Sequence, residues 1–203
     1  MTTKQVETKI ITNKDHYDYF THHYKPDDSM YVGWGDAHKQ LRCFSSLLRI
    51  VEYTNSTLLD VGCGVGDLNI ILNGLNKDVL YTGIDNHPKM IDAARKRYAD
   101  KSFVFDSLKD HKKRYDYVVA CGVFNLRTRD QMTDLYVAVK KMAELAKHGV
   151  ALNLLSSTGA TYQAPELYYY DPAETLVYLT RSGFKADIRH DYAIDDFTIY
   201  IRK

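Results

Sequence analysis

The chain has few cysteines, and they do not form a recognisable set. Its 203 residues include three, Cys43, Cys63 and Cys121, with no CxxC pair. An odd number of scattered cysteines argues against a disulfide framework, and no histidine pair accompanies them at the spacing of a zinc site. We therefore expect reduced thiols, a cytoplasmic protein and no bound metal.

Long hydrophobic runs are also missing. No stretch approaches the roughly 18 apolar residues that a membrane span requires. The first ten residues, MTTKQVETKI, do not contain the apolar segment of a signal peptide. These absences predict a soluble protein with no membrane partner.

Neither sign of charge is in excess. Lys and Arg total 27 and Asp and Glu total 26, so the formal net charge is +1. Nucleic-acid-binding proteins usually carry a basic excess that meets the phosphates. The short basic run Lys112-Lys113-Arg114 is more typical of a solvated surface. We therefore expect no nucleic-acid partner.

What the chain does contain is a regular alternation of short apolar runs and amphipathic stretches. Apolar runs at residues 58–61, 80–84, 103–105, 117–120 and 150–155 predict buried strands. Strands that alternate with helices are typical of a parallel sheet covered on both faces. The sequence therefore predicts one α/β domain, which its length also suits.

Helix signals lie between these runs. Apolar residues recur at spacings of three and four over residues 130–147, and Gly149 is expected to end that helix. Pro88 suits the first turn of another helix, which carries Met90.

The C-terminal part departs from the alternation. Asp171 and Pro172 predict a helix start, and Gly183 predicts its end. Residues 184–191 and 197–202 are strand-like runs joined by only about five residues, too few for a crossover helix. They must pair antiparallel, so a hairpin is expected to close the sheet.

The first 40 residues are rich in aromatic residues and histidine and show little periodicity. They are too few for a core of their own, so we expect a helical cap or lid rather than a separate domain. Residues 40–51 predict a helix that leads into the first strand. The main domain is then expected to span residues 41–203.

The most informative segment is the turn after the first predicted strand. Residues 58–68 read LLDVGCGVGDL, an apolar strand followed by glycines at alternate positions. Such glycines let the backbone turn sharply and approach a ligand closely. A dinucleotide fingerprint needs G-x-G-x-x-G, but here Gly66 comes one residue early and Asp67 follows it.

Acids also end the next two predicted strands. Asp85 follows Gly66 by 19 residues, and Asp106 follows Asp85 by 21. In a doubly wound sheet, the first of these positions accepts hydrogen bonds from ribose hydroxyls. A carboxylate at the second would suit the exocyclic amine of a base. Asp60, Asp85 and Asp106 are therefore predicted to line the carboxyl-end edge of the sheet, where ligands bind.

These motifs resemble those of the class I S-adenosylmethionine-dependent methyltransferases. Residues 60–66 look like the family's first motif, 83–85 its second, 105–108 its adenine motif and 115–121 its fourth-strand motif. The resemblance begins near residue 41 and runs to the C-terminus. It implies a Rossmann-like, seven-stranded, mostly parallel sheet with one antiparallel strand.

The resemblance also implies which residues contact the cofactor. Gly62, Cys63 and Gly64 would contact its methionine part, and Asp85 would hold its ribose. The other implied contacts are Asn86, Met90, Asp106, Ser107 and Leu108 around the adenine, Arg42 at the cofactor carboxylate, and Asp60 and Cys121 within the strand-end motifs. For Arg42, the alternative that it is a surface residue without a ligand contact stays open.

The charges of these residues agree with this cofactor, which is a sulfonium cation without phosphate. Its pocket should contain acids, and Asp60, Asp67, Asp85 and Asp106 supply them. No Lys-Ser/Thr pair follows the glycines, so an anion-binding P-loop is excluded. The expected cofactor is S-adenosylmethionine, with S-adenosylhomocysteine as the product.

The sequence says less about the methyl acceptor. Enzymes of this fold that methylate adenine or glutamine amino groups carry Asn or Asp before Pro-Pro-Tyr after the fourth strand, whereas residues 121–127 read CGVFNLR. Together with the balanced charge, this favours a small-molecule acceptor. Residues 33–35 and 190–198 also resemble a bacterial and phage subgroup of methyltransferase-domain proteins. The candidate acceptor contacts are Tyr24, Trp34, Asn125 and Tyr168.

Other interpretations stay open at this point. The same residues fit a lyase or cyclase that uses the sulfonium cofactor, or a protein that binds the nucleoside without catalysis. A dehydrogenase would bind NAD instead. If the acceptor arrives protonated, His22, His23 or a tyrosine would be candidate bases, and no catalytic residue is assigned. The sequence does not indicate the oligomeric state.

Overall fold

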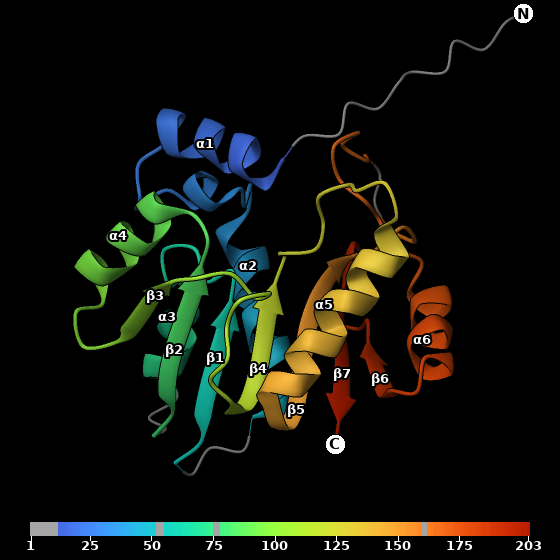
Figure 1. Ribbon diagram of the computed structural model, residues 1–203. Helices are drawn as coiled ribbons and strands as arrows, with labels where there is room; N and C mark the ends of the chain where they lie inside the picture. Colours follow the sequence, from blue (N-terminus) through green and yellow to red (C-terminus); the bar gives the residue numbers. More distant parts are fainter. Residues whose placement is uncertain (1–11, 52–54, 75–77, 160–161) are drawn as a thin grey trace, which may run out of the picture.

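The computed structural model describes residues 12–51, 55–74, 78–159 and 162–203, which form a seven-stranded sheet with helices on both faces (Figure 1). The strands are β1 (Thr57–Val61), β2 (Leu80–Asp85), β3 (Ser102–Phe105), β4 (Tyr115–Cys121), β5 (Ala146–Leu155), β6 (Lys185–Arg189) and β7 (Asp196–Arg202). The helices are α1 (Asn13–His23), α2 (Ala37–Leu47), α3 (Leu68–Gly74), α4 (Pro88–Arg97), α5 (Gln131–Leu145) and α6 (Pro172–Arg181), with 3₁₀ turns η1 (Ser29–Val32) and η2 (Leu48–Ile50).

The sheet has the order β3-β2-β1-β4-β5-β7-β6, and β7 alone runs antiparallel to its neighbours in it. This confirms the predicted Rossmann-like fold class and the C-terminal hairpin. After β1 the chain builds β2 and β3 on one side and then crosses to β4 on the other. A crevice forms where the order reverses, at the carboxyl ends of β1 and β4.

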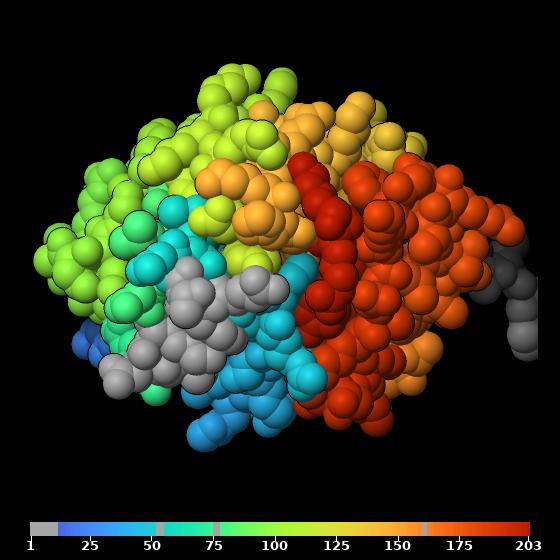
Figure 2. Space-filling model, turned by 90° about the horizontal axis from the view of Figure 1, so that it is seen from below, coloured from blue at the N-terminus to red at the C-terminus, as the bar shows by residue number. Residues whose placement is uncertain are grey.

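Alternate residues of the central strands supply two hydrophobic cores. Leu58 and Val119 pack with residues of α2, α3 and α4, whereas Leu59 and Val118 pack with residues of α5 and α6. Successive side chains of a strand point to opposite faces, so two apolar neighbours can serve both cores. Figure 1 shows α5 in front of the sheet and α6 beside β6 at its edge. Figure 2, seen from the opposite end to the crevice, shows the red and orange C-terminal segments gathered on one side of the molecule.

The segment before α2 forms a helical cap. Figure 1 shows α1 lying across the end of the sheet to which the parallel strands point. The Asp36 side chain accepts the N–H groups of His38 and Lys39, and this cap starts α2 at Ala37. The boundary that the sequence predicted between the cap and the main domain, at residue 40, therefore falls inside α2.

Both helix signals around Pro88 and Pro172 are confirmed. Pro88 begins α4, and Asp171 caps α6 by accepting the N–H of Glu174. Gly183, at a φ of 93°, follows the end of α6. In these two places, local capping chemistry decides where the helix begins and ends.

The expected end of the long helix was wrong. α5 ends at Leu145, β5 begins directly at Ala146, and Gly149 lies inside β5. A Cβ on Gly149 would lie 2.7 Å from Ile50 Cδ1 and 3.3 Å from the Ile201 carbonyl oxygen. The glycine is needed for close packing of η2 on β5 and does not stop a helix.

No helix in the four described ranges is long and apolar enough to cross a membrane. The described side chains also include no group of three His, Cys, Asp or Glu residues placed to hold a metal ion.

Gly149→Ala should lower the free energy of unfolding by about 1–3 kcal/mol, the usual cost of one extra methyl in a packed core. Denaturant titration measures the change. Gly74→Ala is the matched control, because a Cβ there meets nothing within 4 Å. Adding Ile50→Val to Gly149→Ala should restore part of the loss, and equal stability of wild type and Gly149→Ala would contradict the packing described.

Candidate functional site

A cavity of about 830 Å³ opens at the carboxyl ends of the parallel strands. Its walls come from segments that are far apart in the sequence: α1, the stretch from η1 to α2, the strand ends of β1 to β5, the first turn of α4, residues 162–169, and Asp195. Large concave pockets at this position in the fold are the usual ligand sites of α/β proteins.

The glycine turn after β1 forms the floor of this cavity. Gly62, Gly64 and Gly66 all have positive φ, at 65°, 53° and 83°. A Cβ on Gly62 would lie 2.5 Å from Val123 Cγ2, and one on Gly64 would lie 2.9 Å from Val32 Cγ1. The glycines therefore let both the cap and the loop after β4 close down on the turn.

Asp85, at the end of β2, connects two backbone turns. One carboxylate oxygen accepts the Gly64 N–H at 2.9 Å, and the other accepts the His87 N–H at 2.8 Å. Burial raises the pKa of Asp85, while these two amides favour its charged form. Each oxygen keeps a further lone pair free to accept a hydrogen bond from a ligand.

Asp106 follows β3 and is held by its own loop. Its carboxylate accepts the Ser107 N–H at 2.8 Å and lies 2.7 Å from His111 Nδ1. His111 Nε2 is buried and has no partner among the described residues. A proton on Nδ1 alone suits this arrangement, because a buried N–H at Nε2 would be left without an acceptor.

Asp60 is the most deeply buried acid in the cavity wall. It is 3% exposed, and Tyr81 donates its hydroxyl hydrogen to the carboxylate at 2.8 Å. Burial raises the pKa of Asp60 to about 7, with smaller contributions from Asp85 and Asp67. Asp67 is different, because it pairs with Arg97 and so has its charge compensated within the chain.

Most of the residues predicted to form the site do line this one cavity. They are Asp60, Gly62, Cys63, Gly64, Asp85, Asn86, Met90, Asp106, Ser107, Leu108 and Cys121 of the cofactor set, with Trp34 and Asn125 of the acceptor set. The strand-end rule predicted Asp60, Asp85 and Asp106, since the carboxyl ends of parallel strands meet at one edge of the sheet. Most of the other cofactor residues were implied by the family resemblance.

Arg42 is exposed and does not line the cavity, so the structure favours the surface position that the sequence left open for it. Asp36, Gln40 and Phe44 line it from α2 at four-residue spacing, which marks one helix face. Arg42 lies two residues from Gln40, about 200° around the helix, and therefore points elsewhere.

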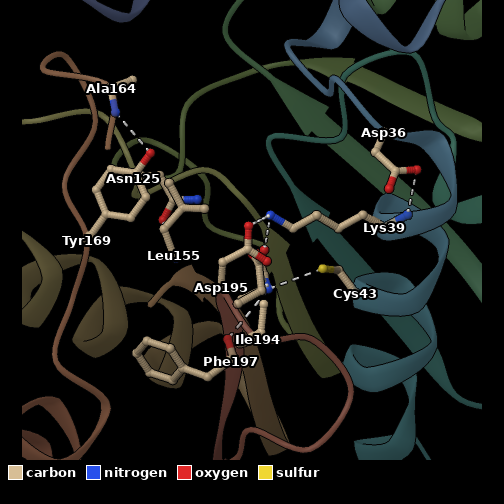
Figure 3. Close-up of polar contacts among 12 residues, drawn as sticks. Asp36, Lys39, Cys43, Asn125, Leu155, Ala164, Tyr169, Ile194, Asp195 and Phe197 are labelled. Atoms are coloured by element: carbon tan, nitrogen blue, oxygen red, sulfur yellow. Dashed lines mark hydrogen bonds and ion pairs between the residues drawn. The ribbon is translucent and has the colours of Figure 1, made fainter. Parts of the chain in front are cut away.

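Lys39 supplies the positive charge on this wall in place of Arg42. Its ammonium group lies 2.8 Å from Asp195 and also pairs with the buried Asp196. Figure 3 shows Lys39 reaching from α2 to Asp195, with Cys43 farther along the helix. Burial alone would lower the Lys39 pKa, but the two carboxylates outweigh it and raise that pKa.

Tyr24 and Tyr168 also lie outside the cavity. Tyr24 ends α1 and packs with the small cluster of Tyr31, Val65 and Met90. Tyr168 packs edge-on against Tyr170, with ring centroids 4.7 Å apart. Its neighbours on either side, Leu167 and Tyr169, line the cavity instead.

The expected bases His22 and His23 are exposed and do not line the cavity, whereas His16 of the same helix does. Burial lowers the pKa of His16, and Glu166 opposes this change. Tyr17 also lines the cavity, but burial raises its pKa to about 12, so it stays protonated at neutral pH. The cavity residues missed from the sequence are thus His16, Lys39, Glu166 and Asp195.

The chain is similar to known methyltransferases over most of its length. A family model described as "Methyltransferase domain" matches residues 59–152. The protein Rv1506c of Mycobacterium tuberculosis (strain ATCC 25618 / H37Rv), whose name also assigns it to the methyltransferases, is 31% identical over 166 residues, which are 77% of this chain and 99% of the relative. This chain belongs to the class I S-adenosylmethionine-dependent methyltransferases.

Solved structures of methyltransferases share the fold. Magnesium protoporphyrin IX methyltransferase from Synechocystis PCC 6803 with bound S-adenosylhomocysteine covers 96% of each chain at 18% identity, with a TM-score of 0.65. A SAM-dependent methyltransferase from Aquifex aeolicus covers 88% of this chain and 98% of its own, at 16% identity and a TM-score of 0.64. These likenesses show the fold alone. Membership of the family makes the methyltransferase described here an enzyme whose cofactor is S-adenosylmethionine.

Asp60 should make the ligand-free methyltransferase less stable as the pH rises. Its pKa is raised from 3.8 to about 7, so ionising it costs free energy in the folded state only. The loss begins near pH 4 and is complete above about pH 7. Asn cannot ionise, so Asp60→Asn should lack this loss of unfolding free energy, which is on the order of 4 kcal/mol between pH 4 and pH 7.

Denaturant titrations of wild type and Asp60→Asn at a series of pH values measure this difference. The two curves of unfolding free energy should diverge between pH 4 and pH 7. Parallel curves would show that Asp60 is ionised in the folded protein at low pH, contrary to its buried setting.

Proposed function

We propose that this methyltransferase binds S-adenosylmethionine along the strand ends and methylates a small-molecule acceptor in the adjoining part of the same cavity. A volume of about 830 Å³ is near the upper end for ligand pockets and leaves room for both molecules. The cofactor supplies an activated methyl group on a sulfonium ion. The observation that carries the proposal is the row of acids at the strand ends, beside a glycine turn that lines the same cavity.

Asp85 is proposed to hold the ribose. Both its oxygens are fixed by backbone N–H groups, and each still has one lone pair for a hydroxyl. Because these amides set the direction of the carboxylate, it is oriented before the ligand arrives. That orientation reduces the entropy lost on binding.

The adenine is proposed to lie between the loop after β3 and the start of α4. Asp106 is positioned by His111 and by the Ser107 N–H, so it can accept from an exocyclic amine. Met90 and Leu108 offer apolar surface to the ring faces, and Asn86 lines the same wall. This set combines one polar contact with apolar flanks, as adenine pockets require.

The methionine part is proposed to lie over the glycine turn. Gly62, Cys63 and Gly64 line that region, and Asp60 adds a buried carboxylate near a positively charged ligand. Lys39, rather than Arg42, is proposed to face the cofactor carboxylate, since it is the lysine in the cavity wall. Its own partners Asp195 and Asp196 hold it in place.

The acceptor is proposed to bind near Trp34 and Asn125. The Asn125 Oδ1 accepts the Leu155 N–H at 3.1 Å, which leaves its Nδ2 without a partner among the described residues. A Cβ on Gly122 would lie 3.4 Å from the Trp34 ring, so the indole packs against the end of β4. A cavity covered by a cap and lined in this way suits a small molecule, the kind of substrate named for the Synechocystis enzyme.

The balanced charge of the chain favours this proposal over a nucleic-acid acceptor. A cytoplasmic location remains a prediction from the cysteine usage.

Thermal unfolding with ligands tests the cofactor assignments. S-adenosylmethionine and S-adenosylhomocysteine at about 100 times their Kd should each add about 2.7 kcal/mol of stability, or roughly 6 °C in Tm. NAD should add nothing. Asp85→Ala should remove most of the shift, because it loses the two hydroxyl contacts.

Glu144→Ala is the control for that experiment, since Glu144 is exposed on α5 and does not line the cavity. It should keep the full shift with both ligands. An unchanged shift in Asp85→Ala would show that the ribose lies elsewhere.

A further inference from the structure

Glu166 stands out among the acids in the cavity wall. The six other acids that line it each have a hydrogen-bond or ion-pair partner within the chain: Asp36, Asp60, Asp67, Asp85, Asp106 and Asp195. Among the residues that the structure describes, the Glu166 carboxylate has none. A half-buried carboxylate without a partner is a place where a cation would be stabilised.

Glu166 is not on a loose segment. Its carbonyl oxygen accepts the Arg127 N–H at 2.9 Å, and the Tyr168 N–H donates to the Asn125 carbonyl oxygen at 2.7 Å. Between these two hydrogen bonds, Leu126 and Leu167 pair as an isolated antiparallel β-bridge. The backbone around Glu166 is therefore fixed to the loop that carries Asn125.

His16 lines the same cavity as Glu166, from the side of the cap. No hydrogen bond to either of its ring nitrogens is found within the described residues, and the ring packs edge-on against Tyr17 and Phe20. Burial lowers its pKa and Glu166 is the charged group that opposes this, so the ring is neutral at physiological pH and can accept a proton. Phe20 in turn lies against Gly33, next to Trp34.

We propose that the acceptor is a primary or secondary amine on an aromatic or apolar body, held as its ammonium by Glu166 and deprotonated by His16. This rests on the function proposed above. Aromatic walls around a carboxylate favour a cation, because ring faces attract positive charge. An acceptor that arrives as a carboxylate or phenolate would meet Glu166 as a like charge.

The chemistry requires such a base. His16 takes one proton from the ammonium onto a ring nitrogen, which frees the amine lone pair. That pair forms the new N–C bond to the methyl group while the C–S bond of the sulfonium breaks, and the bonding electrons stay on sulfur. His16 then releases its proton to water, and the methylated ammonium leaves.

Binding to the S-adenosylhomocysteine complex tests the recognition step without turnover. Calorimetry would compare three probes of similar shape: 2-phenylethylamine, 2-phenylethanol and phenylacetate. The amine should bind wild type at least tenfold more tightly than the other two. Glu166→Gln should abolish that preference, whereas Glu174→Gln, at an exposed glutamate of α6 outside the cavity, should keep it.

The affinity for S-adenosylhomocysteine separates the two proposals. If wild type does not bind it, the proposed function fails. If wild type binds it but shows no preference for the amine, or if Glu166→Gln keeps the preference, only the amine proposal is overturned. Equal affinity of all three proteins for S-adenosylhomocysteine shows that the variants are folded.

His16→Gln tests the proton transfer, with His22→Gln on the exposed side of the same helix as its control. Single-turnover methyl transfer to a bound amine should slow at least tenfold in His16→Gln, while the Kd of that amine changes by less than about threefold. A purely structural role would change binding instead. An unchanged rate, or no transfer from wild type to any amine that binds, would overturn the assignment of His16.

Discussion

The carboxylate of Asp85 joins the two backbone turns on which the proposed cofactor site depends. It accepts one N–H from the glycine turn and one from the start of α4, and so satisfies two donors at the edge of the sheet. The position of the glycine turn and the direction of α4 are thereby tied to the end of β2. A neutral side chain of the same size would leave one of these donors without its charged acceptor.

The residue that Asp85 contacts at the start of α4 also contacts the cap. His87, whose N–H meets Asp85, also lies 3.2 Å from Asp18 of α1 through its Nε2 atom. Val32 of η1 packs where a Cβ on Gly64 would otherwise lie. The cap is therefore anchored to the turns that we propose bind the cofactor, so that closing the cavity and shaping its floor depend on the same residues.

Much of this arrangement could be predicted from the sequence because it follows from local rules. Strand periodicity and the caps at Asp171 and Pro172 predicted the α/β fold, and acids at strand ends predicted three of the cavity acids. The resemblance to the family implied most of the other residues proposed for the cofactor wall. The acceptor wall was harder, because it depends on how α1 and residues 162–169 meet across the sheet. α1 has no buried residue and weak periodicity, so nothing local marked His16 as the histidine that faces the cavity. Gly149 was misread for a similar reason, since its contact with Ile50 is formed only in the folded chain.

The central claim is that Asp85 forms hydrogen bonds to the ribose hydroxyls. The most direct test removes the hydroxyls from the ligand and the carboxylate from the protein, first separately and then together. Calorimetry would measure the binding of S-adenosylhomocysteine and its 2′,3′-dideoxy analogue to wild type and to Asp85→Ala. Wild type should bind the dideoxy analogue at least tenfold more weakly, whereas Asp85→Ala should bind both ligands with nearly equal affinity. An equal loss in both proteins would contradict the account, because the hydroxyls would then be held by some other group.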